Sequence, residues 1–164
     1  MRKTFYLNDD SECPVMAAGV LIYKIKKNVV SVLLSKNRNV YEDLGGRVDL
    51  EDNTIFDTVV REVYEESNKK IDMQKVKKRL KTAEYFYSKK SKYVVYLIKA
   101  NNKEKKLKSF DFGDKEIHDD IYRTIKWMKI TKILDTTKTK LNFRLLNKTL
   151  LERLFLLQKE NDDN

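Results

Sequence analysis

Residues 44–68 read LGGRVDLEDNTIFDTVVREVYEESN, and the most informative pattern in the chain lies here. The stretch opens on two adjacent glycines, Gly45 and Gly46, although the whole chain has only four glycines. It closes on three glutamates within five residues. With so few glycines in the chain, this clustering is informative.

The segment 52–66 has the periodicity of an amphipathic helix. Thr54, followed three residues later by Asp57, is typical of an N-cap. Apolar side chains then form one stripe, which we expect to face the core. The stripe consists of Ile55, Val59 and Val63, with Phe56, Val60 and Tyr64 beside them.

Three carboxylates share another face of this predicted helix. Glu62, Glu65 and Glu66 are spaced i, i+3, i+4 and fall within one narrow arc. Such like-charge pairs each cost roughly 0.2–0.5 kcal/mol in a helix. A bound divalent cation such as Mg²⁺, which prefers carboxylate oxygens, would offset that cost. A solvated acidic face is the alternative, but the paired glycines and Arg61 favour the metal site.

The stretch resembles the Nudix box, which runs Gly, five residues, Glu, seven residues, then Arg-Glu-apolar-x-Glu-Glu-x-Gly. Gly46 begins the match, and residues 61–66 (REVYEE) agree with the second half at every specified position. The resemblance implies one hydrolase domain over residues 1–164. The order of strands, helix, strands and helix agrees with the fold it implies, an α/β/α sandwich with a mixed β-sheet.

The match departs from the family pattern at both ends of the predicted helix. Asp52 stands at the box's first Glu position, with Glu51 beside it and one extra residue before the arginine. Either acid is therefore a candidate for that role. The closing Gly is replaced around Ser67 and Asn68. Asparagine can adopt the left-handed conformation that glycine would supply.

The resemblance implies a set of metal ligands and catalytic groups. Mg²⁺ or Mn²⁺ would be bound by the carboxylates of Glu62, Glu65 and Glu66, with the carbonyl of Gly46 completing the coordination. Arg61 would orient the carboxylates by ion pairing; an ordinary surface salt bridge is the alternative. The general base that activates water is expected to be Glu62 or Glu65.

Residues outside the box are candidates for contacting the substrate. We expect Arg47, Tyr41 and Glu116 to take part. Asp119 and Asp120 are further candidates for an acid from the same later loop, and a solvated loop is the alternative for all three acids. Other aromatic residues could stack on a base or simply pack in the core; these are Tyr23, Phe86 and Tyr87.

The rest of the chain alternates between strand and helix patterns. No GxGxxG or Walker motif indicates a dinucleotide-binding or P-loop fold. We expect hairpins over 16–25 with 28–35 and over 81–87 with 92–100, a long loop over 103–120, a strand running into a helical turn over 125–133, an amphipathic helix over 145–158, and a frayed tail over 159–164.

Composition limits the remaining functions. Cys13 and His118 are the only cysteine and histidine among 164 residues, which excludes an internal disulfide and a Cys/His zinc site. No apolar run approaches the ~18 residues of a membrane span, and the first residues lack the apolar core of a signal peptide. The sequence therefore predicts a cytoplasmic protein without a membrane partner, and leaves its oligomeric state open.

The net charge of +10 favours a polyanionic partner. The lysine-rich segment 69–81, KKIDMQKVKKRLK, would suit RNA binding or a solvated helix. Three substrate classes stay open: small nucleotides, capped RNA (mRNA decapping) and inositol pyrophosphates. A non-catalytic nucleotide- or RNA-binding module is the alternative from another functional class.

Overall fold

The computed structural model describes residues 3–118, 120–135 and 139–162. Its helices are α1 Ile55–Glu66, α2 Met73–Leu80, α3 Ile130–Leu134 and α4 Lys148–Asp162. Its strands are β1 Phe5–Tyr6, β2 Pro14–Val15, β3 Ala17–Lys26, β4 Val29–Asn37, β5 Val40–Glu42, β6 Leu44–Arg47, β7 Glu84–Ser88, β8 Tyr93–Lys99 and β9 Thr124–Lys129.

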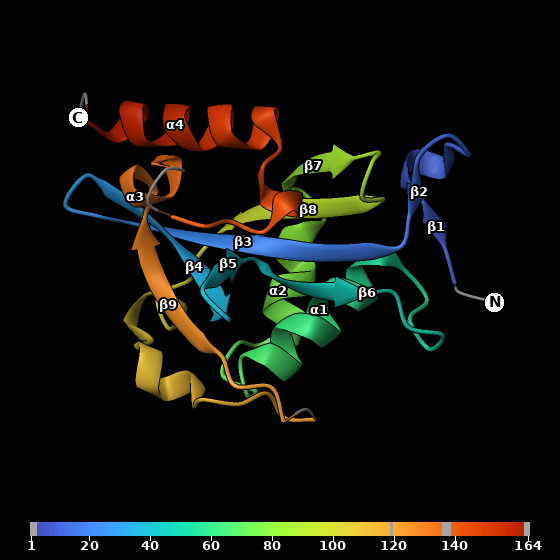
Figure 1. Ribbon diagram of the computed structural model, residues 1–164, viewed down its shortest axis with the longest axis horizontal. Coiled ribbons are helices and arrows are strands. Elements are labelled where there is room, and N and C mark those ends of the chain that lie inside the picture. The colour runs from blue at the N-terminus through green and yellow to red at the C-terminus, as the bar shows by residue number, and fades with distance from the viewer. Residues whose placement is uncertain (1–2, 119, 136–138, 163–164) are drawn as a thin grey trace.

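The long strand β3 organises the main sheet (Figure 1). It pairs antiparallel with β4 and β6 and parallel with β8, so the sheet is mixed. β7 extends the sheet beyond β8, and β5 and β9 both pair with β4. The two predicted hairpins, β3–β4 and β7–β8, are confirmed. At the first turn, Lys27 and Asn28 both have positive φ, as tight two-residue hairpin loops require.

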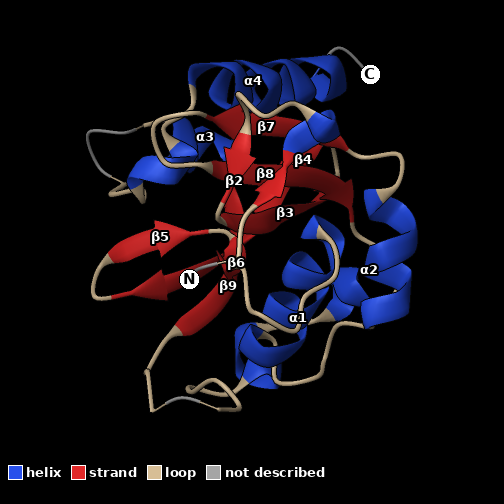
Figure 2. Cartoon of the chain, turned by 90° about the vertical axis from the view of Figure 1, so that its right-hand side faces the viewer, coloured by secondary structure: helices blue, strands red, loops and turns tan. Residues whose placement is uncertain are grey.

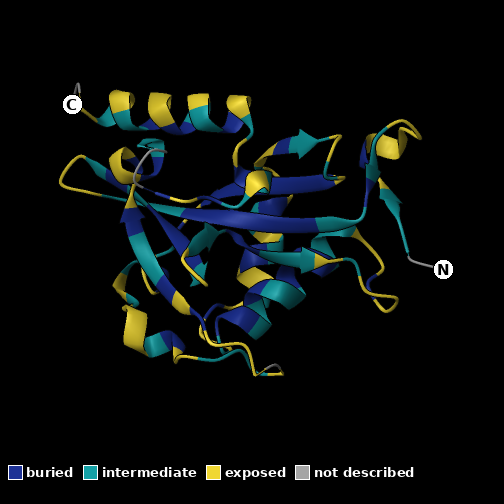
Figure 3. Ribbon diagram, viewed as in Figure 1, coloured by how far each residue is buried: buried dark blue, intermediate teal, exposed yellow. Residues whose placement is uncertain are grey.

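Helices cover both faces of this sheet (Figure 2). Side chains alternate between the faces of a strand. On β3, Val20 and Ile22 therefore join a buried cluster with residues of α1 and α2, whereas Leu21 joins a second cluster with residues of α3 and α4. Figure 3 shows these two buried layers on either side of β3. The predicted α/β/α sandwich with a mixed sheet is confirmed.

Local interactions set both ends of α1. The hydroxyl of Thr54 accepts a hydrogen bond from the Asp57 backbone N–H at 3.1 Å, which confirms the predicted N-cap. After Glu66 the chain turns through Asn68 and Lys69, whose φ angles are 50° and 64°. Asn68 thus takes the left-handed conformation expected of it. Its side-chain amide also donates to the carbonyls of Phe112 and Lys115.

Several element bounds differ from the sequence prediction. The last helix begins at Lys148 instead of residue 145, and it continues to Asp162 through positions expected to fray. The predicted long loop contains two 3₁₀-helices, Glu104–Lys106 and Ser109–Phe112. The lysine-rich segment 69–81 contains α2, whose buried Val76 and Leu80 anchor it.

Every helix in the part of the chain that the structure describes is too short or too polar to span a membrane.

A buried ionic network ties the C-terminal region to β6. Asp43, fully buried before β6, accepts a hydrogen bond from the Tyr93 hydroxyl on β8 and one from Arg144 Nε at 2.9 Å. Arg144 also donates to the carbonyl of Gly45 at 3.2 Å. Burial raises the pKa of Tyr93, and the charge of Asp43 adds to the rise. The network therefore holds the start of β6 in place.

We predict that Arg144→Met destabilises the protein by about 3–5 kcal/mol, because it leaves the buried Asp43 carboxylate without its cationic partner. Urea unfolding followed by circular dichroism measures this loss. The double variant Asp43→Asn/Arg144→Met removes both charges and should recover most of the lost stability. Equal unfolding midpoints for Arg144→Met and the unsubstituted protein would contradict the role given to the network.

Candidate functional site

Strand β6 lies against the C-terminal half of α1. The Gly45 backbone N–H donates a hydrogen bond to Glu66 Oε1 at 2.8 Å. At Gly46 the approach is closer still, since a Cβ added there would overlap the carboxylate of Glu62. Gly46 is therefore needed for close contact with the acidic helix, whereas a Cβ at Gly45 would overlap Gly19 and the Tyr93 hydroxyl within the sheet.

Arg61 links the loop before α1 to two of the predicted carboxylates. Its Nη1 contacts Glu62 Oε1 at 2.8 Å and Glu65 Oε2 at 3.5 Å. Its Nη2 donates to the backbone carbonyl of Arg47 at 2.8 Å. On its other side the guanidinium binds Asp52 through Nε and Nη2, both at 3.1 Å. One planar cation thus sets the orientation of two acidic helix residues.

Of the two acids before α1, Asp52 is the one that faces inward. It is buried, and it accepts hydrogen bonds from Thr58 Oγ1 and the Asp49 N–H, each at 2.8 Å, in addition to Arg61. Burial alone would raise the pKa of Asp52, but these donors outweigh it and lower the pKa. Glu51 is exposed. Of the two candidates, Asp52 is therefore the acid that contacts Arg61.

Negative charge accumulates in a partly dehydrated space around Glu62 and Glu66. Burial raises the pKa of the Glu62 carboxyl to about 6; Arg61 opposes the rise, and the charges of Glu65 and Glu116 add to it. Burial also raises the pKa of Glu66 well above its ordinary value, with Glu62 and Glu116 contributing. Glu116, which comes from the loop before β9, is thus electrostatically coupled to both helix residues.

The three helix carboxylates do not all turn toward one point. Glu62 and Glu65 face Arg61, whereas Glu66 faces the backbone of Gly45. Within residues 3–118, 120–135 and 139–162, no group of three acidic, histidine or cysteine side chains has the arrangement of a metal site. The predicted ligand set of Gly46, Glu62, Glu65 and Glu66 is therefore gathered between β6 and α1, but its carboxylates are engaged by protein groups.

The remaining predicted residues lie in different places. The Arg47 side chain is exposed at the end of β6. Tyr41 packs against the core cluster on the α3–α4 side, so the structure does not bring it to the carboxylates on α1. Asp120 forms a surface ion pair with Lys115 at 3.3 Å. Asp119 lies outside the described residues.

Sequence reasoning missed Arg123, which holds the end of α1. This buried arginine donates to the backbone carbonyls of Glu66 and Gly113, and also to those of Phe112 and Lys115. It therefore joins the helix terminus to the loop that carries Glu116. No local motif marks Arg123, because its partners are distant in sequence.

No known family model matches the sequence, and no curated protein is detectably similar to it. Solved structures do match. The Nudix domain of NrtR from Shewanella oneidensis, crystallised with ADP ribose, is 16% identical over 92% of this chain and 88% of that chain, with a TM-score of 0.51. The Ap4A hydrolase of C. elegans is 20% identical over 87% of this chain and 96% of that chain, with a TM-score of 0.50. At these identities the likeness concerns the fold, and the chain has the fold of the Nudix domain.

Proposed function

We propose that this protein is a divalent-metal-dependent hydrolase that cleaves the phosphoanhydride bond of a nucleoside-diphosphate-linked substrate. The observation that carries the proposal is the apposition of the Gly45–Gly46 pair with Glu62 and Glu66, together with the Arg61 bridge to Glu65. A purely structural helix has no need of several carboxylates beside a glycine pair, because their repulsion and burial cost stability.

The donor chemistry fits Mg²⁺ or Mn²⁺. Carboxylate and carbonyl oxygens are the ligands that such hard cations prefer, and Glu62, Glu65, Glu66 and the Gly46 carbonyl would supply them. Glu66 is buried and, among the described residues, no lysine or arginine forms a salt bridge with it. A bound cation would neutralise diphosphate oxygens and lower the pKa of water.

The chain's own residues supply positioning and proton transfer in this proposal. Arg61 holds Glu62 and Glu65 through its guanidinium and is itself anchored by Asp52. Glu62 or Glu65 is the candidate for the general base, since Arg61 orients both carboxylates. Glu116 adds negative charge from the facing loop, which favours cation binding.

Two structural neighbours support a nucleotide as the substrate. One is named an Ap4A hydrolase, and the other was crystallised with ADP ribose. Both compounds contain a nucleoside joined to further groups through phosphoanhydride bonds. Capped RNA contains the same linkage and stays an alternative substrate, which would make the protein a decapping hydrolase. Inositol pyrophosphates are a third class with the same bond.

We predict that Glu62→Gln lowers hydrolysis at least 100-fold in the presence of Mg²⁺ or Mn²⁺, because the amide neither accepts the proton nor binds the cation well. Release of product from Ap4A, ADP ribose and cap-labelled RNA provides the measurement. Glu51→Gln is the matched control, since this exposed acid precedes α1 and should keep nearly full activity. Undiminished turnover by Glu62→Gln would refute the proposal.

A second candidate function is a nucleotide-binding module without catalysis. It is favoured by one observation: Glu62 and Glu65 are occupied by Arg61 and do not converge with Glu66 as a metal site. In a binding module this ion-pair cluster would serve stability alone. The two candidates therefore differ in whether divalent cations bind specifically at these carboxylates.

We predict opposite effects of Glu66→Gln with and without metal. Without metal, the variant should be more stable by about 1 kcal/mol, because burying an amide costs less free energy than burying a carboxylate. The amide oxygen can still accept the hydrogen bond from the Gly45 N–H. In the unsubstituted protein, Mn²⁺ at 100 times its Kd should add about 2.7 kcal/mol, and the variant should lose this gain. Urea unfolding with and without Mn²⁺ tests both statements. Equal Mn²⁺ stabilisation of both proteins would exclude Glu66 as a ligand and favour the binding module.

A further inference from the structure

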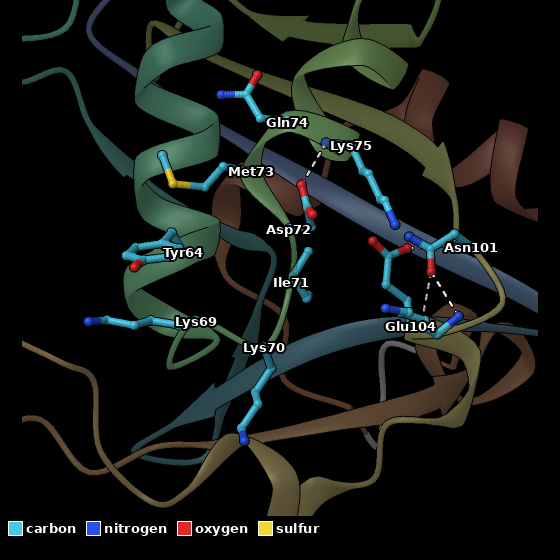
Figure 4. A pocket seen from close by; sticks show the side chains of 11 residues that line it. Tyr64, Lys69, Lys70, Ile71, Asp72, Met73, Gln74, Lys75, Asn101 and Glu104 are labelled. Atoms are coloured by element: carbon cyan, nitrogen blue, oxygen red, sulfur yellow. Dashed lines mark hydrogen bonds between the residues drawn. The ribbon is translucent and has the colours of Figure 1, made fainter.

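A separate cavity of about 480 Å³ opens where α1 ends and α2 begins (Figure 4). Its walls come from three segments: the last turn of α1 at Tyr64, the connection into α2, and the segment that follows β8 around Asn101. On a helix, Tyr64 and Glu62 point in nearly opposite directions, because two residues correspond to about 200° of rotation. The cavity is therefore distinct from the carboxylate site.

Four lysines line this cavity: Lys69, Lys70, Lys75 and Lys103. All four are exposed, and within the described residues none of their ammonium groups forms a salt bridge or a side-chain hydrogen bond. The ammonium group of Lys69 lies 5.6 Å from the centre of the Tyr64 ring. Unpaired ammonium groups gathered around a hollow create a positive potential that attracts anions.

The two acidic residues of the cavity do not neutralise these lysines. Glu104 is buried, and its carboxylate is held by Arg79, with Oε2 2.8 Å from Nη1. It also accepts the Asn101 N–H at 2.8 Å. Asp72 caps α2 by accepting the Lys75 N–H at 3.0 Å. Both acids are thus used to build the walls.

The lysines of the cavity come from different segments of the chain. The pKa of Asp72 is lowered first by the hydrogen bond from the Lys75 backbone N–H, and the charges of Lys75 and Lys103 add to this effect. Lys75 belongs to α2, whereas Lys103 comes from the segment after β8. The two walls therefore present cationic side chains toward the same space.

The positive charge also continues beyond the cavity. Lys78 lies three residues after Lys75, so both occupy the same face of α2. On the other wall, exposed Lys106 follows Lys103 within the same short segment. A single phosphate would need only one cluster of donors. Several separate lysines beside an aromatic ring match a strand with repeated phosphates and exposed bases.

We propose that this lysine-lined cavity binds the phosphate backbone of single-stranded nucleic acid, with Tyr64 available for stacking on a base. The binding surface is independent of the proposed hydrolase activity, because none of its residues belongs to the carboxylate site. This binding surface would account for part of the net positive charge of the chain. It would also explain why segment 69–81 has exposed lysines beside the buried residues of α2.

The test is binding of a fluorescein-labelled 12-nucleotide oligouridylate to the full chain, followed by fluorescence anisotropy in EDTA at several salt concentrations. The test variant replaces Lys69, Lys70, Lys75 and Lys103 with Ala. The matched control replaces four exposed lysines elsewhere, Lys26, Lys90, Lys132 and Lys159. Both variants lose the same net charge. Lys103→Glu, on the segment outside α1 and α2, provides a second variant if the fourfold substitution impairs folding.

We expect the cavity variant to raise the Kd at least tenfold and the control variant at most twofold. The slope of log K against log salt should fall by roughly 3 in the cavity variant, since each lost phosphate contact contributes about 0.7. Hydrolysis of small nucleotides should stay unchanged, which separates this proposal from the proposed function. Equal weakening by both variants would overturn it. The proposal would also be overturned if tripolyphosphate or polyglutamate, at equal total charge, competed as strongly as unlabelled oligouridylate.

Discussion

The acidic end of α1 depends on how closely β6 approaches it. The Gly45 N–H reaches the Glu66 carboxylate, and Gly46 lies so near Glu62 that no side chain fits between them. Two sets of contacts hold the strand there: antiparallel pairing with β3, and the buried Arg144, which joins Asp43 and the Gly45 carbonyl. Loss of either would separate these carboxylates from the backbone of Gly45 and Gly46.

The acidic residues around this contact are not all paired with a cationic side chain among the described residues. Arg61 forms ion pairs with Asp52, Glu62 and Glu65 together. Glu66 is buried and accepts a hydrogen bond from the Gly45 backbone N–H, and burial raises the pKa of Glu62 to about 6. Such groups reduce stability in the absence of a cation, and this pattern is common where a protein gives up stability for function. The Nudix fold provides a rigid frame that tolerates the cost, because α1 packs its apolar stripe into the core.

The surroundings of α1 differ in charge on its two sides. The side facing β6 gathers the carboxylates of the proposed metal site, whereas its last turn borders a cavity lined by exposed lysines. Both surfaces would engage phosphate, one through a bridging cation and the other directly. A helix buried on its apolar stripe holds both surfaces in a fixed relation, because neither can move without disturbing the core.

Much of the architecture could be read from local pattern. The α1 helix, its Thr54 cap and both hairpins follow from periodicities of 3.6 and 2 and from turn residues, and these act over a few positions. The likeness to the Nudix box likewise pointed to the acidic helix and to the glycine pair. Only the tertiary structure decided the contacts between segments that are distant in sequence. Arg123 reaches Glu66 across 57 positions and Arg144 reaches Asp43 across 101, and no spacing rule encodes such pairs. The same reason explains why Asp52 faces inward instead of Glu51, why Tyr41 packs on the other side of the sheet, and why the lysines near α2 surround a cavity: each outcome depends on which neighbours the tertiary structure brings alongside.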